Sequence, residues 1–427
     1  MPALSLAPLS EDGRRPENVI WIVLDALRQD VFDAYLKRDG LSSLAQGSTY
    51  FPRTFAQGSW TYPSVFSFLT GLYPFNCGVS RLVRQDGGLT SLCADFDDSC
   101  PTIFDILRQH GYRVASILDG WGYTLRTTAG QEGREDRYFE DRWGWFCGQG
   151  RRYLPLQELR DASLSFVHTA AGTGPFLLFV RSLYTHAPYH GIFENVDQVT
   201  RLSRKRWAFA LVEGFVRGLQ RFERVYLAPL LAALAQSGQL SHTQVILCSD
   251  HGDMLWNLED DLRREPAHPD EEMWRHQLEP YNALIKVPLL IWGAPMRGIY
   301  PRRFRLMDVV PTLLEGLGIE YDPAQFDGVS LRRADPRPLY ADSAGYGYGG
   351  LAFQGAGPKL LMSHRLGAVS YEIAEDEYES LLLRRAASNQ VEGVVDWLQR
   401  ASRIRGLSDG YDEKVLLKRL RALGYVE

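Results

Sequence analysis

The chain has 427 residues, 45% of them hydrophobic and 23% charged, so it can bury a large core and exceeds the size of one typical domain. Its formal net charge of -5 is small for this length, which argues against a broad basic face that binds nucleic acid. The five cysteines are scattered and none is spaced as CxxC, so a reducing compartment is favoured over a disulfide framework.

The N-terminal segment, residues 1–17, carries Pro, Ser and charged residues but no apolar core segment. We therefore expect a disordered tail that is neither a signal peptide nor a membrane anchor. No window of the chain approaches the uninterrupted apolar length of a membrane span. These patterns predict a cytoplasmic protein without a membrane segment, and they leave its oligomeric state open.

Residues 18–24 form a nearly continuous apolar run that is rich in β-branched side chains. Such a run predicts a strand that is buried on both faces of a parallel sheet. The run ends in Asp25. Because ligands of open α/β sheets lie beyond the carboxyl ends of the strands, Asp25 is predicted to point at a ligand site.

The next motif is the stretch 59–74, in which Thr61 stands just before Pro63, Ser64 and an apolar, helix-like run. Proline is tolerated in a first helical turn, and the N–H groups and positive dipole end of a helix start suit an anion. Thr61 would then lie where a phosphate or sulfate group is held. Taken alone, however, the stretch favours an ordinary helix cap.

Residues 102–118 are typical of a helix followed by a strand, and residues 156–180 repeat that order. The irregular segment between them, residues 119–150, is consistent with a long loop over the site. His186 and His190 follow the second of these strands, where the sheet offers its ligands. A lone His is more often a satisfied hydrogen-bonding residue, but two in such a loop leave a catalytic role equally open.

Residues 204–236 predict a long helix over one face of the sheet, and residues 243–249 predict a second core strand. This strand ends in Asp250, His251 and Gly252. Two candidate ligands thus follow another strand end, with a glycine that lets the backbone turn tightly. Asp-His-Gly is a weak signal by itself, but it is much stronger alongside Asp25.

His276 follows an acidic insert, residues 258–272, and precedes a predicted strand at residues 287–292. A further helix is predicted over residues 307–318. Neither the insert nor the loop before residue 151 contains a motif that identifies a substrate.

The chain changes character from about residue 336, where glycines cluster and short strand-like pieces and charged helices follow. We therefore divide the chain into a catalytic domain, residues 18–335, and a C-terminal subdomain, residues 336–427. The subdomain is predicted to hold a small antiparallel sheet and helices. No internal repeat or low-complexity tract is evident.

Asp25, Asp250 and His251 can together bind one divalent cation, and the Thr61 oxygen can complete its coordination. Oxygen-rich ligation with one imidazole suits Mn²⁺ or Zn²⁺, whereas Ca²⁺ and Mg²⁺ are possible but less favoured because they rarely take nitrogen. The cation would lower the pKa of the hydroxyl and polarise phosphoryl or sulfuryl oxygens. Thr61 would then attack, with a His as acid or base.

With these motifs in their order, the chain resembles the sulfatase and phosphonate monoester hydrolase branch of the alkaline phosphatase superfamily. The resemblance spans nearly the whole chain and implies a three-layer α/β/α domain with a smaller C-terminal subdomain. The motifs that carry it are Asp25 after a strand, Thr61-Tyr62-Pro63-Ser64, Thr70-Gly71-Leu72-Tyr73-Pro74, His186-Ala187-Pro188-Tyr189, Asp250-His251-Gly252, His276 with Val287-Pro288-Leu289, Pro311-Thr312-Leu313-Leu314 and Leu420-Arg421-Ala422-Leu423-Gly424-Tyr425.

The resemblance implies roles for particular residues. It makes Thr61 the nucleophile, and it assigns the cation to Asp25, Asp250 and His251. His186 and His276 match positions where relatives place a His or Lys around the substrate oxyanion and the leaving group. His190, four residues after His186, is a candidate substrate contact.

Three departures from the family pattern bear on the chemistry. Sulfatases oxidise a Cys or Ser to formylglycine, and Thr61 cannot become that aldehyde, so no formylglycine is expected. Val65 stands where their motif has Arg, and Ala26 stands where they have a second Asp. One metal ion is favoured; His186, His190 and His276 are the residues that a two-metal site would use.

The sequence thus predicts a metal-dependent hydrolase that cleaves a small anionic ester, a phosphodiester or phosphonate monoester, through a covalent Thr61 intermediate. The alternatives are a phosphoryl transferase, a sulfuric ester hydrolase, and a metal-binding pseudoenzyme that acts as an interaction module through its C-terminal subdomain. The natural substrate is not indicated.

Overall fold

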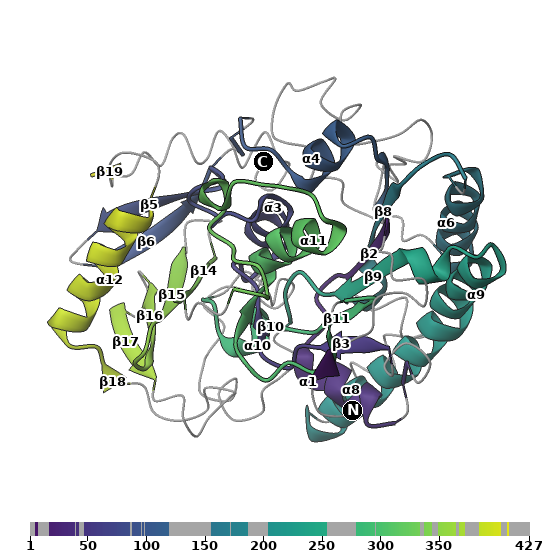
Figure 1. The fold of residues 1–427 in the computed structure, drawn as a ribbon. Coiled ribbons are helices and arrows are strands. Elements are labelled where there is room, and N and C mark those ends of the chain that lie inside the picture. The colour runs from purple at the N-terminus through teal and green to yellow at the C-terminus, as the bar shows by residue number, and fades with distance from the viewer. Residues whose placement is uncertain are drawn as a thin grey trace, which may run out of the picture.

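A computed structural model gives the fold of the chain (Figure 1). The residues that it describes are 5–6, 17–38, 40–41, 47–85, 88–94, 96–97, 99–118, 155–170, 172–186, 204–253, 279–294, 296–333, 337–343, 349–363, 367–371, 384–402 and 408–409. His190 and His276 lie outside these residues, as do the segment 119–150, the insert 258–272 and the last predicted helix.

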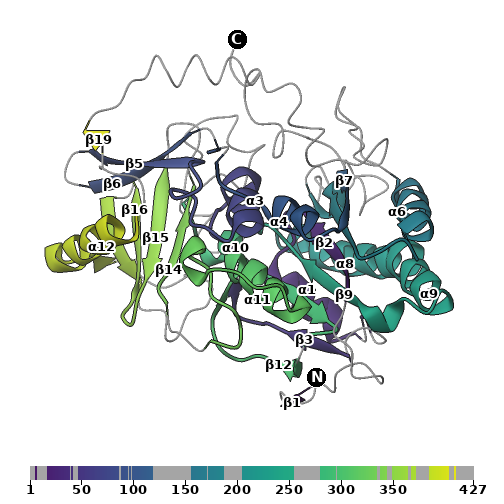
Figure 2. The same cartoon turned by 45° about the horizontal axis from the view of Figure 1, so that its top comes forward.

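One large sheet runs through the centre of the described part (Figures 1 and 2). Its strands are β1 (Ser5–Leu6), β2 (Asn18–Leu24), β3 (Ser48–Tyr50), β7 (Arg113–Leu118), β8 (Phe176–Ser182), β9 (Thr243–Cys248), β11 (Leu289–Trp292) and β12 (Met296–Ile299). Their spatial order is β1-β12-β3-β11-β9-β2-β8-β7. The central pairs β9–β2, β2–β8 and β8–β7 are parallel, as is β12–β3, while β11 is antiparallel to both of its neighbours. The predicted mostly parallel sheet is confirmed.

Helices cover both faces of this sheet, which gives the predicted three layers (Figure 2). The helices packed on one face are α1 (Gln29–Leu36), α6 (Leu156–Ala170), α8 (Arg204–Phe222) and α9 (Ala228–Gln236). Those on the other face are α3 (Thr61–Thr70), α4 (Ile103–Gln109) and α11 (Val309–Leu317). Where one long helix was predicted over residues 204–236, the structure has α8 and α9 joined by a π-helical segment at Glu223–Leu227.

The alternation of side chains along β2 explains why two apolar layers form. Successive side chains of a strand point to opposite faces, and every residue of β2 is buried. Trp21 and Val23 therefore join the core beneath α3, whereas Ile20 and Ile22 join the core beneath α1 and α6. Asp25 continues the series of Trp21 and Val23, so its position along the strand places it on the α3 side.

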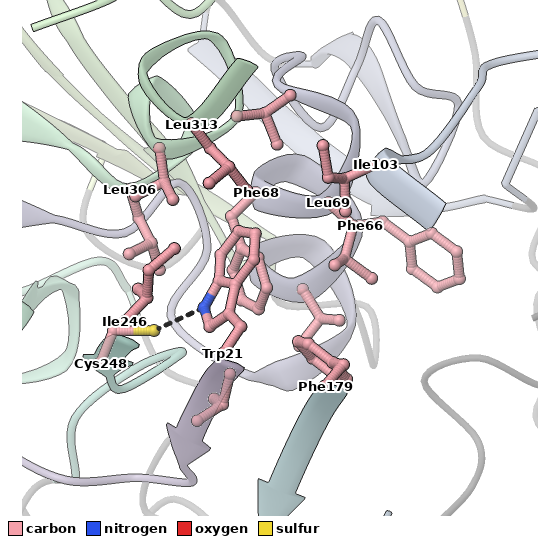
Figure 3. Packing of buried hydrophobic residues seen from close by; sticks show 14 of the residues in the cluster. Trp21, Phe66, Phe68, Leu69, Ile103, Phe179, Ile246, Cys248, Leu306 and Leu313 are labelled. Carbon is pink, nitrogen blue, oxygen red and sulfur yellow. Dashed lines mark hydrogen bonds between the residues drawn. The ribbon is translucent and has the colours of Figure 1, made fainter. Parts of the chain in front are cut away.

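Apolar packing anchors α3 on the sheet (Figure 3). Phe68 lies against the fully buried Trp21, with ring centroids 5.3 Å apart, and Trp21 Nε1 donates to Cys248 Sγ on β9 at 3.3 Å. Each fully buried Phe or Leu side chain contributes about 1.5–3 kcal/mol relative to its exposed state. The helix ends at Gly71, whose φ of 69° is left-handed backbone that glycine adopts without strain. The first residue of α3 is thereby fixed over the strand ends.

The C-terminal part forms a second, antiparallel sheet, as predicted. Its strands are β14 (Leu339–Asp342), β15 (Gly350–Gln354), β16 (Lys359–Ser363), β17 (Gly367–Tyr371) and β18 (Arg384–Arg385), with α12 (Ser388–Ala401) packed beside them. The hairpin of β5 (Ser80–Gln85) and β6 (Gly88–Cys93) pairs with β19 (Ser408–Asp409), and a third small sheet joins β4 (Thr54–Phe55), β10 (Lys286–Val287) and β13 (Phe304–Arg305).

The second sheet also holds the chain segment that leads into α3. Asp342, at the end of β14, forms an isolated parallel bridge with Gly58. The Ser59 amide donates to the Asp342 carbonyl at 3.0 Å, and the Asp342 amide donates to the Gln57 carbonyl at 3.0 Å. The Asp342 carboxylate accepts hydrogen bonds from Ser80 and Tyr340. The second sheet therefore contacts the segment that leads into α3.

No described helix combines the length and the apolar character that a membrane crossing requires.

Candidate active site

The ends of β2 and β9 bring three buried side chains together, as the sequence predicts. Asp25, Asp250 and His251 are each fully buried, and one ligand atom of each lies within 4.8 Å of the others. His251 Nε2 is 3.3 Å from Asp25 Oδ1 and 3.8 Å from Asp250 Oδ2. β2 and β9 are adjacent and parallel, so the two carboxylates leave the sheet at the same edge.

Backbone contacts hold these groups in place. The Asp25 amide donates to the Ser182 carbonyl, and Thr185 Oγ1 donates to the Asp25 carbonyl at 2.6 Å. Asp250 Oδ1 accepts from the His251 amide at 2.9 Å and from the Ala26 amide at 3.3 Å. This second bond is made with Ala26 at a φ of 61°, in the left-handed region that a non-glycine residue adopts at a cost.

Position 252, the last of the Asp-His-Gly motif, has no room for a side chain larger than that of glycine. Gly252 donates its amide to the Leu284 carbonyl at 2.7 Å. A Cβ at this position would lie 2.0 Å from the Ala283 carbonyl oxygen, which no real contact allows. Gly252 therefore lets the chain pass close to α10 (Asn282–Ile285), while His251 remains at the site.

Thr61 is the first residue of α3, and its hydroxyl faces the carboxylates. Its Oγ1 is 3.1 Å from His251 Nε2 and 3.4 Å from Asp25 Oδ2. The N-cap of α3 is Trp60, and no side chain caps the helix there. The ordinary cap that the stretch favours on its own is therefore not what Thr61 forms. Ser64, one turn further on, donates to the Asp250 carbonyl at 2.5 Å and ties the helix to β9.

Arg181, on β8, is a member of the cluster that we did not predict. Its side chain is 3% exposed, and its Nη2 forms a close ion pair with Asp25 Oδ2. The same nitrogen donates to Thr61 Oγ1 at 3.2 Å, and Nε lies 3.7 Å from Asp250 Oδ2. The predicted strand stopped at Val180, one residue short of this arginine. The signal was present: Arg181 follows five apolar residues of the strand and continues the α3-side series of Leu177 and Phe179, and a buried arginine needs acidic partners.

The buried charges shift one another's pKa. Burial opposes ionisation of Asp25, but the positive charge of Arg181, with His186 and His251, holds the pKa of Asp25 well below its usual range. Burial raises the pKa of Asp250, and the nearby charge of Asp25 raises it further. Burial alone would lower the pKa of His251, but the charges of Asp250 and Asp25 raise it to about 9.

The cluster fits a divalent cation. Among the described residues, Asp25 Oδ1 and Asp250 Oδ2 are buried oxygens without a hydrogen-bond partner, and both face His251 Nε2. Two carboxylate oxygens and one imidazole nitrogen match the ligands of Zn²⁺ or Mn²⁺. His251 would have to be neutral to bind a cation, so protons and the cation would compete for this imidazole.

His186 is the one of the three predicted acid, base or substrate-binding His residues that lies within the described residues. His186 lies beside the cluster: its Nε2 is 4.0 Å from Asp25 Oδ1, and its side chain is 14% exposed. It follows a short 3-10 helix, Leu183–Thr185, that continues β8. His190 and His276 lie outside the described residues. The His186 imidazole therefore lies next to the cluster and remains partly accessible to solvent.

The three-layer fold is that of the alkaline-phosphatase-like class, and its strand ends carry a hydroxyl beside a cluster that could hold a cation. The sequence profile of the Sulfatase family matches residues 17–319. The chain belongs to the sulfatase family, whose members are metal-dependent hydrolases that act on small anionic esters.

Two kinds of relative agree with this assignment. The chain is similar to the choline-sulfatase of Rhizobium meliloti (strain 1021), with 23% identity over 387 residues that cover 74% of this chain and 70% of the relative. Its fold is similar to that of Ps i-CgsB (TM-score 0.64, 17% identity, 96% and 97% of the two chains covered). It is also similar to the fold of the phosphonate monoester hydrolase from Silicibacter pomeroyi (TM-score 0.58, 17% identity, 95% and 96% covered).

Proposed function

We propose that this sulfatase-family hydrolase cleaves a phosphodiester or a phosphonate monoester through a covalent intermediate on Thr61. One observation carries the proposal: Thr61 Oγ1 lies 3.1 Å from His251 Nε2 and 3.4 Å from Asp25 Oδ2, at the start of a helix. A hydroxyl in that position is next to the groups that would hold a cation, and an anionic ester would meet the positive end of the helix.

The identity of the nucleophile favours phosphorus over sulfur. Formylglycine hydrate, the nucleophile of sulfatases, can expel sulfate by breaking its own C–O bond. Thr61 has no second hydroxyl to drive that step, so an ester on Oγ1 must be cleaved by water at its central atom. Phosphoryl-enzyme intermediates are hydrolysed in this way.

The proposed reaction needs two displacements at phosphorus. Thr61 Oγ1 attacks, its proton passes to a base, and the bond from phosphorus to the leaving oxygen breaks. The leaving oxygen takes a proton from an acid, for which His186 and His276 are the candidates. Water then gives up a proton to a base and attacks phosphorus, the bond to Oγ1 breaks, and Oγ1 takes a proton, which restores the threonine. Asp25 and Asp250 supply negative charge that would hold a cation at the site.

A divalent cation held by Asp25, Asp250 and His251 would supply Lewis-acid polarisation of the ester oxygens and favour the ionised hydroxyl. Mn²⁺ and Zn²⁺ suit the mixed oxygen and nitrogen ligands better than Ca²⁺ or Mg²⁺. We propose one such ion, because the described carboxylates and imidazoles form a single cluster of this kind. His190 remains a candidate substrate contact.

Substrate preference is the direct test. With added Mn²⁺, we expect the purified protein to turn over bis(p-nitrophenyl) phosphate faster than p-nitrophenyl sulfate, and to lose this activity in a chelator. Faster release of p-nitrophenol from the sulfate would instead identify a sulfuric ester hydrolase, as the name of the choline-sulfatase relative would suggest. Binding of Mn²⁺ without turnover of either ester, or of a phosphonate monoester, would favour the metal-binding pseudoenzyme.

A further inference from the structure

We propose that Arg181 is a catalytic residue that acts directly on the nucleophile, as a fixed cationic hydrogen-bond donor to Thr61 Oγ1. The inference rests on the proposed role of Thr61 and extends it. The carrying observation is that one nitrogen, Nη2, is shared between Thr61 Oγ1, at 3.2 Å, and the ion-paired Asp25 Oδ2. A guanidinium held in this way cannot turn aside without breaking a buried ion pair.

The position of Arg181 is set by the sheet and not by a loop. In the register of the sheet, Arg181 lies opposite Val23 of β2 and Leu118 of β7. Its neighbours two and four residues earlier, Phe179 and Leu177, are fully buried under α3 and α4. Sites built on strands hold their side chains more precisely than sites on loops. Arg181 is thus preorganised toward the first turn of α3.

Arg181 and a bound cation can be accommodated together. Arg181 contacts Asp25 through Oδ2, whereas the Asp25 oxygen without a hydrogen-bond partner is Oδ1. On Asp250, the corresponding oxygen is Oδ2, which is 3.7 Å from Arg181 Nε. The cation would use the oxygens that face His251, and Arg181 would keep the other edge of Asp25 and the threonine hydroxyl. The two positive charges would then flank Oγ1.

The chemistry of arginine defines what this contact can do. A guanidinium stays protonated at any working pH, so Arg181 cannot be the base that takes the Thr61 proton. It can stabilise negative charge on Oγ1 while the proton leaves, and it does so again when the phosphorus bond to Oγ1 breaks. In a buried site such a preoriented donor has a large effect, because no solvent must reorganise around the charge.

Arg181 could also replace a positive charge that is missing from the nucleophile motif. Residue 65, where related sulfatases carry Arg, is Val in this chain, and Val65 is fully buried in the apolar core beneath α3. The helix that carries Thr61 therefore offers no positively charged side chain at that position. Strand β8 offers one, the guanidinium of Arg181. We infer that β8 supplies the positive charge that α3 lacks.

The test compares Arg181→Lys with Arg305→Lys at saturating Mn²⁺. Both arginines are 3% exposed and ion-paired with an aspartate, but the partners of Arg305 are Asp308, Tyr73 and Asp327, none of which belongs to the candidate site. Lys keeps the charge but loses the planar fork that reaches two acceptors. We expect Arg181→Lys to lower kcat for bis(p-nitrophenyl) phosphate by about 100-fold with little change in KM, as loss of a transition-state donor does. Arg305→Lys should keep kcat within about twofold.

Folding and metal content are measured alongside kcat, by thermal unfolding and elemental analysis. Arg181→Gln serves as a second variant in case Arg181→Lys does not fold. A folded, metal-loaded Arg181 variant with unchanged kcat would overturn the inference, as would an activity loss that extra Mn²⁺ restores, since Arg181 would then act only by arranging the cation ligands. Parent protein that turns over no ester would refute the proposed function instead, so the two failures are distinguishable.

Discussion

Thr61→Ala is expected to abolish turnover while leaving the fold nearly intact. The substitution removes Oγ1, the proposed nucleophile, so that the rate of bis(p-nitrophenyl) phosphate hydrolysis should fall by at least about 1,000-fold. The N-cap of α3 is Trp60 and not Thr61, and Arg181 keeps its ion pair with Asp25, so the free energy of unfolding should change by only about 1 kcal/mol. Initial rates of the parent and the variant test the loss of turnover, and their thermal unfolding curves test the small change in stability.

Thr61→Ser is the matched control. It keeps the hydroxyl and loses the β-branch that restricts the side chain to few rotamers, so part of the rate should remain. If Thr61→Ala instead hydrolyses the diester at the parent rate under saturating Mn²⁺, Thr61 is not the nucleophile. A variant that is inactive because it is unfolded would show itself in the unfolding curve.

Asp250→Ala should lose both the bound cation and the activity. Asp250 Oδ2 is one of the two buried oxygens in the cluster that lack a hydrogen-bond partner, and Oδ1 orients the backbone at Ala26 and His251. Removing this carboxylate takes away one of three proposed protein ligands, which should weaken cation binding by far more than the 10–100-fold typical of an outer partner. The parent protein should retain close to one equivalent of Mn²⁺ or Zn²⁺ on elemental analysis.

Asp327→Asn supplies the control for a buried aspartate outside the cluster. Asp327 accepts hydrogen bonds from the Tyr73 amide and from Asn76 Nδ2, neither of which is a candidate ligand. This variant should keep one equivalent of cation, whatever its stability. A stable second equivalent in the parent, or full cation retention by Asp250→Ala, would contradict the single site.

The strand-end residues could be predicted because their signals are local. An unbroken apolar run identifies a buried strand, and the residue just after it lies at the edge where such sheets bind ligands. Asp25, Asp250 and His251 each satisfy this rule, and the structure places all three in one cluster. The three layers were implied by the family resemblance, and the small antiparallel sheet was predicted from the change in composition after about residue 336.

Arg181 and the role of the second sheet depend on information that short patterns do not carry. Pairing Arg181 with Asp25 requires knowing that β8 lies beside β2, which is a contact between residues 156 positions apart. The bridge from Asp342 to Gly58 spans most of the chain and fixes the approach to Thr61. The sequence also indicated one long helix where α8 and α9 are joined by a π-helical segment, because the apolar spacing continues through it.

The covalent intermediate is the most direct test of the account. Excess enzyme is mixed with bis(p-nitrophenyl) phosphate, quenched in acid during the single turnover, digested, and analysed by mass spectrometry. We expect the peptide containing Thr61 to gain the mass of a p-nitrophenyl phosphoryl group during turnover and to lose it when turnover is complete. Hydrolysis of the diester without a transient adduct on Thr61, or with the adduct on another residue, would contradict it.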